Sequence, residues 1–175
     1  RWLDPPPAAA VAEARKRLTV LEALDADGRI TAHGRALASL PLEPRIGHML
    51  VRAGEMGLAQ TAAEVAVLLG ERGIGGQDID LSQRRIRWRR ESGKRADAAR
   101  GLARRWSRLV KAGSPATATD HATGICLALA FPDRLSKRRS GDGADWASVG
   151  GRGFRLDPLS PLARETWLAV GEVQG

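Results

Sequence analysis

Residues 18–45 read LTVLEALDADGRITAHGRALASLPLEPR, and this stretch decides the fold of the N-terminal part. Pro7 favours the start of a helix, Asp27-Gly28 marks a turn, and Thr31 is suited to cap the helix HGRALASL. Residues 29–31 form a short extended piece between the turn and that helix. Apolar side chains recur at helical spacing through the first helix, namely Val11, Ala14, Leu18, Leu21 and Leu24.

The rest of the first 57 residues completes this pattern. Pro41 and Pro44 bracket a stiff connector, and a further helix ends near Gly57. Helices, a turn and a short extended piece in this order are typical of a winged-helix domain at 1–57. Its net charge is only +1, and its second helix offers a single basic residue, Arg35. These charges favour a packing module over a reader of DNA sequence.

Residues 58–135 have the pattern of a helical bundle. An apolar stripe at 62–69 is followed by the loop GERGIGG at 70–76, which lacks the Gly-Lys-Ser/Thr ending of a phosphate-binding loop. Asp80 or Ser82 caps the next helix, and Gly93 breaks that helix in two. A last helix starts at Pro115 and ends before Pro132.

The C-terminal segment, 136–175, has the pattern of the start of a β-rich domain. Residues 137–139 and the GDG at 141–143 predict a polar loop, and DWASVGGRGFRL predicts a hairpin around Gly151. A strand follows at 167–170, and an edge strand near the last residue suggests a truncated sheet. The predicted fold class is therefore mostly α with a small β part.

Positive charge is concentrated in residues 84–111, RRIRWRRESGKRADAARGLARRWSRLVK. Twelve lysines and arginines against Glu91 and Asp97 give this stretch a net charge of +10, so the rest of the chain carries −2. A solvated helix face or a coding bias toward arginine is the alternative. Such a bias would spread arginine evenly, whereas residues 58–83 contain only Arg72 against four acidic residues. Nucleic acid is therefore the expected partner.

The candidate nucleic-acid contacts are the basic residues of this stretch and of residues 137–139. Trp106 is interpreted as a core residue, and Trp88 either packs in the core or stacks on a base. The residues expected to contact the strand are Arg84, Arg85, Arg87, Arg89, Arg90, Lys94, Arg95, Arg100, Arg104, Arg108, Lys111, Lys137, Arg138 and Arg139.

Composition excludes several other classes of protein. No apolar run is long enough to span a membrane, and the single cysteine, Cys126, excludes an internal disulfide and fits a reducing, cytoplasmic compartment. The three histidines lack ligand spacing, so we expect no metal, and we expect no catalytic residue or bound cofactor. The chain starts at Arg1 without a methionine, which suggests a fragment.

The motifs also resemble a known family. LTVLEALDADGRITAHGRALASLPLEPR resembles the L-x-x-L-x-A-L helix and G-x-[IL]-T-x-x-G-x-x-[LM]-x-x-L-P-[LV]-[DE]-P-R run that follows the motor of DEAH/RHA-type helicases. FPDRLSKRR at 131–139 is similar to the end of the ratchet (HA2) domain in bacterial members. VGGRGFRLDPLSPLARETWLAV at 149–170 resembles the C-terminal domain of HrpB-type helicases, with Gly150 where their pattern usually has Asn.

The resemblance implies a non-catalytic accessory module of an ATP-dependent 3′-to-5′ helicase of the second superfamily. It implies a winged helix at 1–57, a ratchet bundle at 58–135 and the start of the C-terminal domain at 136–175. ATP and magnesium would bind RecA-like domains in cis, because this chain has neither a P-loop nor an Asp-Glu-Ala-His box. In similar helicases these modules form one wall of a tunnel for single-stranded RNA or DNA.

Two alternatives remain open. The chain could be a free-standing winged-helix regulator that prefers duplex DNA, or a scaffold whose arginines pair with an acidic protein partner. The second helix is only weakly basic, with Arg35 as its single basic residue, and this argues against the first alternative. Loss of nucleic-acid binding at all salt concentrations would support the second.

Overall fold

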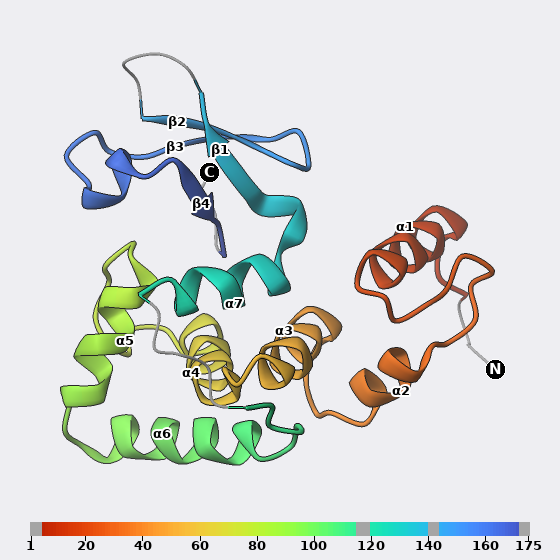
Figure 1. Ribbon diagram of the computed structural model, residues 1–175, viewed down its shortest axis with the longest axis horizontal. Coiled ribbons are helices and arrows are strands. Elements are labelled where there is room, and N and C mark those ends of the chain that lie inside the picture. The colour runs from red at the N-terminus through yellow and green to blue at the C-terminus, as the bar shows by residue number, and fades with distance from the viewer. Residues whose placement is uncertain (1–4, 115–119, 140–143, 172–175) are drawn as a thin grey trace. The chain divides into compact units, whose positions relative to one another are not determined.

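The structure is a computed structural model that describes residues 5–114, 120–139 and 144–171 (Figure 1). The chain divides into two compact units, Arg1–His48 and Met49–Gly175. The described residues form seven α-helices and a four-stranded antiparallel sheet. The predicted fold class, mostly α with a small β part, is therefore confirmed.

The first unit contains α1 (Ala8–Val20) and α2 (Ala32–Ala38), and α3 (Pro44–Glu55) begins within it. The short extended piece is present, because Leu24 and Ile30 form an isolated antiparallel bridge on either side of the turn at Gly28. Thr31 caps α2, and its side-chain oxygen accepts a hydrogen bond of 2.8 Å from the amide of Gly34. The sequence signals for the turn, the cap and the helix start are thus confirmed.

Gly34 allows α2 to lie directly against the chain that follows α1. A Cβ at this position would overlap the carbonyl oxygen of Ala23 and would lie 2.9 Å from the side chain of Ile30. Ala23 and Leu37 are buried here, with exposed fractions of 5% and 6%. The glycine of the T-x-x-G motif therefore serves close packing rather than an unusual backbone conformation.

The second unit is built around α4 (Ala59–Gly70), which contacts α5 (Leu81–Arg90), α6 (Lys94–Ser107) and α7 (Ala122–Ala130). The sequence predicted a single apolar stripe on this helix. In the structure every residue of α4 from 62 to 68 is buried, because helices pack on several of its sides. One of these buried residues is charged, Glu64, and its arginine partners lie on α5.

The boundaries of the basic helices follow local signals. The side chain of Asp80 accepts a hydrogen bond of 2.8 Å from the amide of Ser82 at the start of α5. Gly93 has a φ of 121° and separates α5 from α6, as the sequence predicted. α7 begins at Ala122, and the helix start expected at Pro115 falls on residues outside the described ranges.

The sheet has the strand order β3-β2-β1-β4 and is antiparallel throughout. β1 is Leu135–Arg138, β2 is Asp145–Ser148, β3 is Gly153–Arg155 and β4 is Trp167–Ala169, with short 3₁₀ helices at Pro132–Arg134 and Pro161–Arg164. The β2–β3 hairpin and β4 confirm the sequence predictions. The polar loop predicted at 137–139 is wrong for Lys137 and Arg138, which lie in β1, while residues 141–143 are outside the described ranges.

β1 is a strand because two other strands supply its backbone partners. Lys137 lies opposite Ala147 of β2 and opposite Trp167 of β4. Basic residues have low strand propensity, but in this central position they complete hydrogen-bonded ladders on both sides. These pairings join residues up to 34 positions apart, as in Leu135 and Ala169, so no local sequence pattern predicts them.

The sheet has one buried face. Trp146 of β2 is fully buried, and its indole nitrogen donates a hydrogen bond of 3.3 Å to the carbonyl of Glu165. Ala144 and Ala163 are buried with it, and Leu156 and Leu168 pack against this cluster.

None of the helices in the described ranges has the length and apolar character that a membrane-spanning helix requires.

We expect Gly34→Ala to destabilise the first unit by about 1–3 kcal/mol, because the added methyl group has no space against Ala23. Urea denaturation followed by far-ultraviolet circular dichroism measures this effect. Gly124→Ala in α7 is the matched control, since its Cβ meets nothing within 4 Å. The control should be neutral or stabilising by up to about 1 kcal/mol. Equal stability of both variants would contradict the packing account.

Cys126 of α7 should be unreactive in the folded chain, because burial raises the pKa of its thiol from 9.0 to about 12. Since the folded pKa lies above the unfolded one, the stability linked to this proton is lost as the pH rises from 9 toward 12. Alkylation by iodoacetamide at about pH 8.5 should be at least about a hundredfold slower in buffer than in denaturant. The Cys126→Ala variant should lose less stability over the same rise in pH. Fast alkylation of the native chain would contradict this burial.

Candidate nucleic-acid interface

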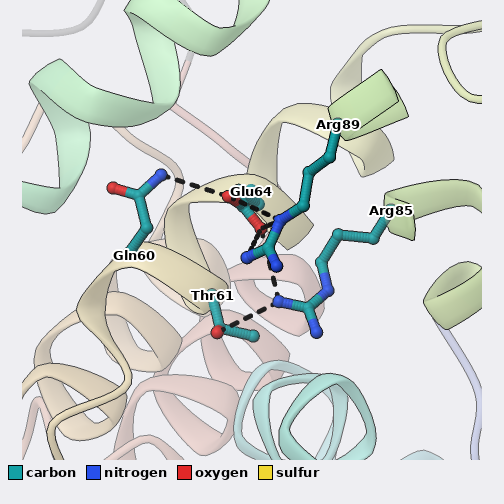
Figure 2. A network of polar contacts seen from close by, with 5 residues as sticks. All are labelled: Gln60, Thr61, Glu64, Arg85 and Arg89. Carbon is teal, nitrogen blue, oxygen red and sulfur yellow. Dashed lines mark hydrogen bonds and ion pairs between the residues drawn. The ribbon is translucent and has the colours of Figure 1, made fainter. Parts of the chain in front are cut away.

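The carboxylate of Glu64 binds two arginines of α5 (Figure 2). Its oxygens accept hydrogen bonds from Arg89, the shortest being 2.8 Å, and one of 3.3 Å from Arg85. Gln60 donates to the same carboxylate, and Arg85 also donates to the hydroxyl of Thr61. The side chains of Glu64 and Arg85 are only 10% and 14% exposed. Arg85 and Arg89 therefore join α5 to α4.

Other arginines of α5 also have partners within the chain. Arg84 is half-buried and donates to the backbone carbonyls of Leu68 and Ile74. Arg87 is exposed and forms an ion pair of 2.9 Å with Asp78. Both side chains hold the loop between α4 and α5 against α5.

Two arginines of α6 also form hydrogen bonds and ion pairs within the chain. Arg95 donates a hydrogen bond of 2.6 Å to the carbonyl of Arg72 and pairs with Glu71 at 3.5 Å. Arg100 pairs with Asp97 and donates a hydrogen bond of 2.7 Å to the carbonyl of Trp88. Six of the twelve basic residues in 84–111 thus contribute to the packing of α4, α5 and α6.

The remaining six basic residues of 84–111 are exposed, and the structure gives them no hydrogen bond or ion pair from their side chains to other described residues. They are Arg90, Lys94, Arg104, Arg105, Arg108 and Lys111. Arg104, Arg105, Arg108 and Lys111 cluster at the C-terminal end of α6 and just beyond it, and we call these four residues the α6 basic patch. Arg90 and Lys94 lie at the α5–α6 turn, about 15 Å along α6 from Arg104.

Arg105 belongs to this patch but was missed by the sequence reasoning. The i, i+4 pattern selected Arg100, Arg104 and Arg108, and Arg105 lies off that stripe. In the structure it is exposed and lines a shallow hollow together with Glu71, Arg95 and Leu102. Arg105 is identified by its exposure and by having no acidic partner within the described ranges, neither of which is visible in sequence spacing.

The two tryptophans of this region differ in burial. Trp88 is fully buried, and its indole nitrogen donates a hydrogen bond of 3.3 Å to the carbonyl of Ala96. Of its two interpretations, core packing is therefore confirmed and base stacking is wrong. Trp106 was expected in the core but is only half-buried, because the fully buried positions of α6 are the small residues Ala96, Ala99 and Ala103.

The three basic residues in and just after β1 are not equivalent. Lys137 and Arg139 are exposed, and the ammonium of Lys137 lies 5.4 Å from the centre of the Trp167 ring. Arg138 is half-buried, and its Nε is buried without a hydrogen-bond partner. Alternation along a strand places Arg138 on the face opposite to Lys137.

The glycine-rich loop between α4 and α5 packs against α5. The amide of Gly75 donates a hydrogen bond of 3.1 Å to the carboxylate of Glu91 at the end of α5. A Cβ at Gly75 would overlap the carbonyl oxygen of Arg84. Within the described ranges, no group of three His, Cys, Asp or Glu side chains lies closely enough to hold a metal ion.

Comparisons with known proteins give the family that the chain resembles. Residues 14–42 match the family described as "Helicase associated domain (HA2), winged-helix". The chain is 33% identical over 170 residues to the ATP-dependent RNA helicase HrpB of Escherichia coli, covering 95% of this chain and 19% of that protein. It is 31% identical over 88 residues to the pre-mRNA-splicing factor ATP-dependent RNA helicase prp22 of Schizosaccharomyces pombe, which is 50% of this chain and 8% of that protein.

Solved structures give the same result over nearly the whole chain. The crystal structure of the E. coli DExH-box NTPase HrpB superposes with a TM-score of 0.73 at 31% identity, over 96% of this chain and 19% of that one. The winged helix, the bundle and the sheet thus define the chain as a C-terminal accessory region of a DEAH/RHA helicase. Within that class the region is of the HrpB type, and the chain spans about a fifth of the length of the E. coli HrpB protein.

We expect removal of the Glu64 carboxylate to destabilise the second unit strongly. Glu64→Ala leaves Arg85 buried without its anion and should lower the free energy of unfolding by about 3–5 kcal/mol. Glu64→Gln retains an acceptor oxygen and should lose less, about 1–3 kcal/mol. The measurement is urea denaturation followed by circular dichroism.

The control for this prediction is Glu13→Gln in α1. Glu13 pairs with Arg17 at 3.1 Å, but both side chains are more than half exposed, at 54% and 60%. Its loss should change stability by no more than about 0.5 kcal/mol. If Glu64→Ala were as mild as this control, the buried ion pair would not hold α5 to α4.

Proposed function

We propose that this chain is the non-catalytic accessory module of an ATP-dependent 3′-to-5′ helicase and that it binds a single strand of RNA or DNA through the phosphate backbone. The observation that carries the proposal is the α6 basic patch, four exposed cations without a partner among the described residues. The basic residues named from the sequence remain the candidates, with those already paired inside the chain acting through packing. ATP and magnesium would act at RecA-like domains of the parent protein, and the module alone should not hydrolyse ATP.

The arrangement of charge along α6 supports binding of an anion. Arg104 lies four residues from both Arg100 and Arg108, and like charges at this spacing destabilise a helix by about 0.2–0.5 kcal/mol per pair. Lys94 is the first residue of α6, where the helix dipole disfavours a cation. Helix stability alone therefore does not explain these residues, whereas phosphate groups would relieve both repulsions.

The proposed contacts are suited to binding that does not depend on the base sequence of the nucleic acid. Exposed arginines and lysines neutralise phosphates without reading base edges. A strand that moves through a helicase needs contacts of this kind, which form and break equally well for every base. The weakly basic first unit, with Arg35 as the lone basic residue of α2, fits an accessory role better than that of a free-standing DNA reader.

The test is the salt dependence of binding to a fluorescent single-stranded oligonucleotide of about 12 nucleotides. If four to six phosphates are neutralised, the log–log slope of affinity against salt should be about −3 to −4. Arg104→Glu/Arg108→Glu should weaken binding about tenfold or more and reduce that slope by about 1.4. Arg15→Glu/Lys16→Glu in α1 changes the net charge equally and is the matched control, which should bind almost as well as the parent chain.

Three results would contradict the proposal. Affinity that does not change with salt would exclude phosphate contacts as its source. Equal loss of affinity in the two double variants would indicate a nonspecific effect of net charge. Loss of all oligonucleotide binding together with retained binding to an acidic protein would favour the scaffold alternative.

A further inference from the structure

One face of the sheet is open and carries an exposed tryptophan. The pairing register aligns Gly153, Ala147, Lys137 and Trp167 in one row across β3, β2, β1 and β4. Directly opposed residues of an antiparallel sheet project from the same face, so this row lies on one surface. The buried cluster around Trp146 lies on the opposite face, because Trp146 neighbours Ala147 along β2.

Trp167 is unusual among the large side chains of the sheet. Its exposed fraction is 53%, whereas that of Trp146 is 0%. The ammonium of Lys137 lies over its ring, 5.4 Å from the ring centre. Proteins that bind single-stranded nucleic acids combine these two kinds of group: the aromatic ring stacks on a base and the cation binds a phosphate.

The surroundings of the row attract an anion. Ala147 and Gly153 project at most one methyl group beside Lys137, and the guanidinium of Arg139 lies beside Gly153, 3.9 Å from where its Cβ would be. The next row holds Arg155, whose guanidinium binds Asp145 at 2.7 Å and thereby has its pKa raised. Arg139 is exposed beyond the end of β1, which leaves this face with an excess of positive charge.

We propose that this open face binds the bases of a single-stranded nucleic acid, with Trp167 as the stacking platform and Lys137 as a phosphate contact. The inference rests on the proposed function and adds to it a base-dependent contact, whereas the α6 basic patch contacts phosphates alone. When a base stacks on Trp167, the ammonium of Lys137 leaves the ring and neutralises the adjacent phosphate. Stacking accepts every base because each has a π face, so the site remains blind to sequence.

The experiment compares two single-stranded probes of equal length and phosphate number, an oligothymidylate and an abasic oligonucleotide of about 12 units. The 175-residue chain should bind the oligothymidylate about tenfold more tightly than the abasic probe. Trp167→Leu should remove this difference and leave affinity for the abasic probe unchanged. Trp167→Phe keeps an aromatic ring and should retain most of the difference.

Two further readouts keep the inference testable if one variant folds poorly. Trp167 fluorescence, obtained as the difference between the parent chain and Trp167→Phe, should be quenched by oligothymidylate and much less by the abasic probe. Lys137→Ala should weaken binding of both probes by a similar factor, because it removes a phosphate contact and leaves the ring.

The outcomes separate this inference from the proposed function. If both probes bind equally well to the parent chain, and Arg104→Glu/Arg108→Glu weakens both, the α6 basic patch binds phosphates and the stacking platform is refuted. If Trp167→Leu retains the full preference for oligothymidylate, the bases bind elsewhere and the platform is again refuted. If neither probe binds the parent chain, the proposed function and this inference both fail.

Discussion

The arrangement of the basic helices depends on the ion pairs that the buried carboxylate of Glu64 forms. This carboxylate binds Arg85 and Arg89 and so fixes α5 on α4. With α5 in place, the guanidinium of Arg100 on α6 donates a hydrogen bond to the carbonyl of Trp88. The indole nitrogen of Trp88 in turn donates a hydrogen bond to the carbonyl of Ala96 on α6. This chain of contacts orients α6, whose C-terminal end carries the α6 basic patch. Glu64 thus fixes α5, while backbone carbonyls and other acidic residues hold Arg84, Arg87, Arg95 and Arg100.

Much of the fold could be predicted because its signals are local. Thr31 and Asp80 cap helices with side chains two or three residues from their partners, and Gly93 breaks a helix through its own backbone conformation. The β2–β3 hairpin joins strands separated by only a few residues. Such features depend on neighbouring residues alone, so their sequence patterns were sufficient.

The sequence could not predict which arginines pair within the chain and which remain exposed, because this depends on contacts between residues far apart in the chain. Glu64 precedes Arg89 by 25 residues, and Glu71 precedes Arg95 by 24. Spacing along a helix placed Arg100 and Arg104 on one face, but only the fold shows that Arg100 pairs with Asp97 whereas Arg104 has no partner in the part of the chain that the structure describes. The same limit applies to Lys137, whose position in β1 and contact with Trp167 depend on strands that pair across long loops.

We propose that a nucleic acid contacts the exposed cations that have no partner among the described residues, and not the cations paired within the chain. The most direct measurement is photo-crosslinking of a single-stranded oligonucleotide containing 4-thiouridine, with the crosslinked residues mapped by mass spectrometry. The account predicts crosslinks in peptides that contain residues 104–111 and Trp167, and few on the α5 segment from Arg84 to Arg89. Crosslinks concentrated on α5, or on α2 of the first unit, would contradict it.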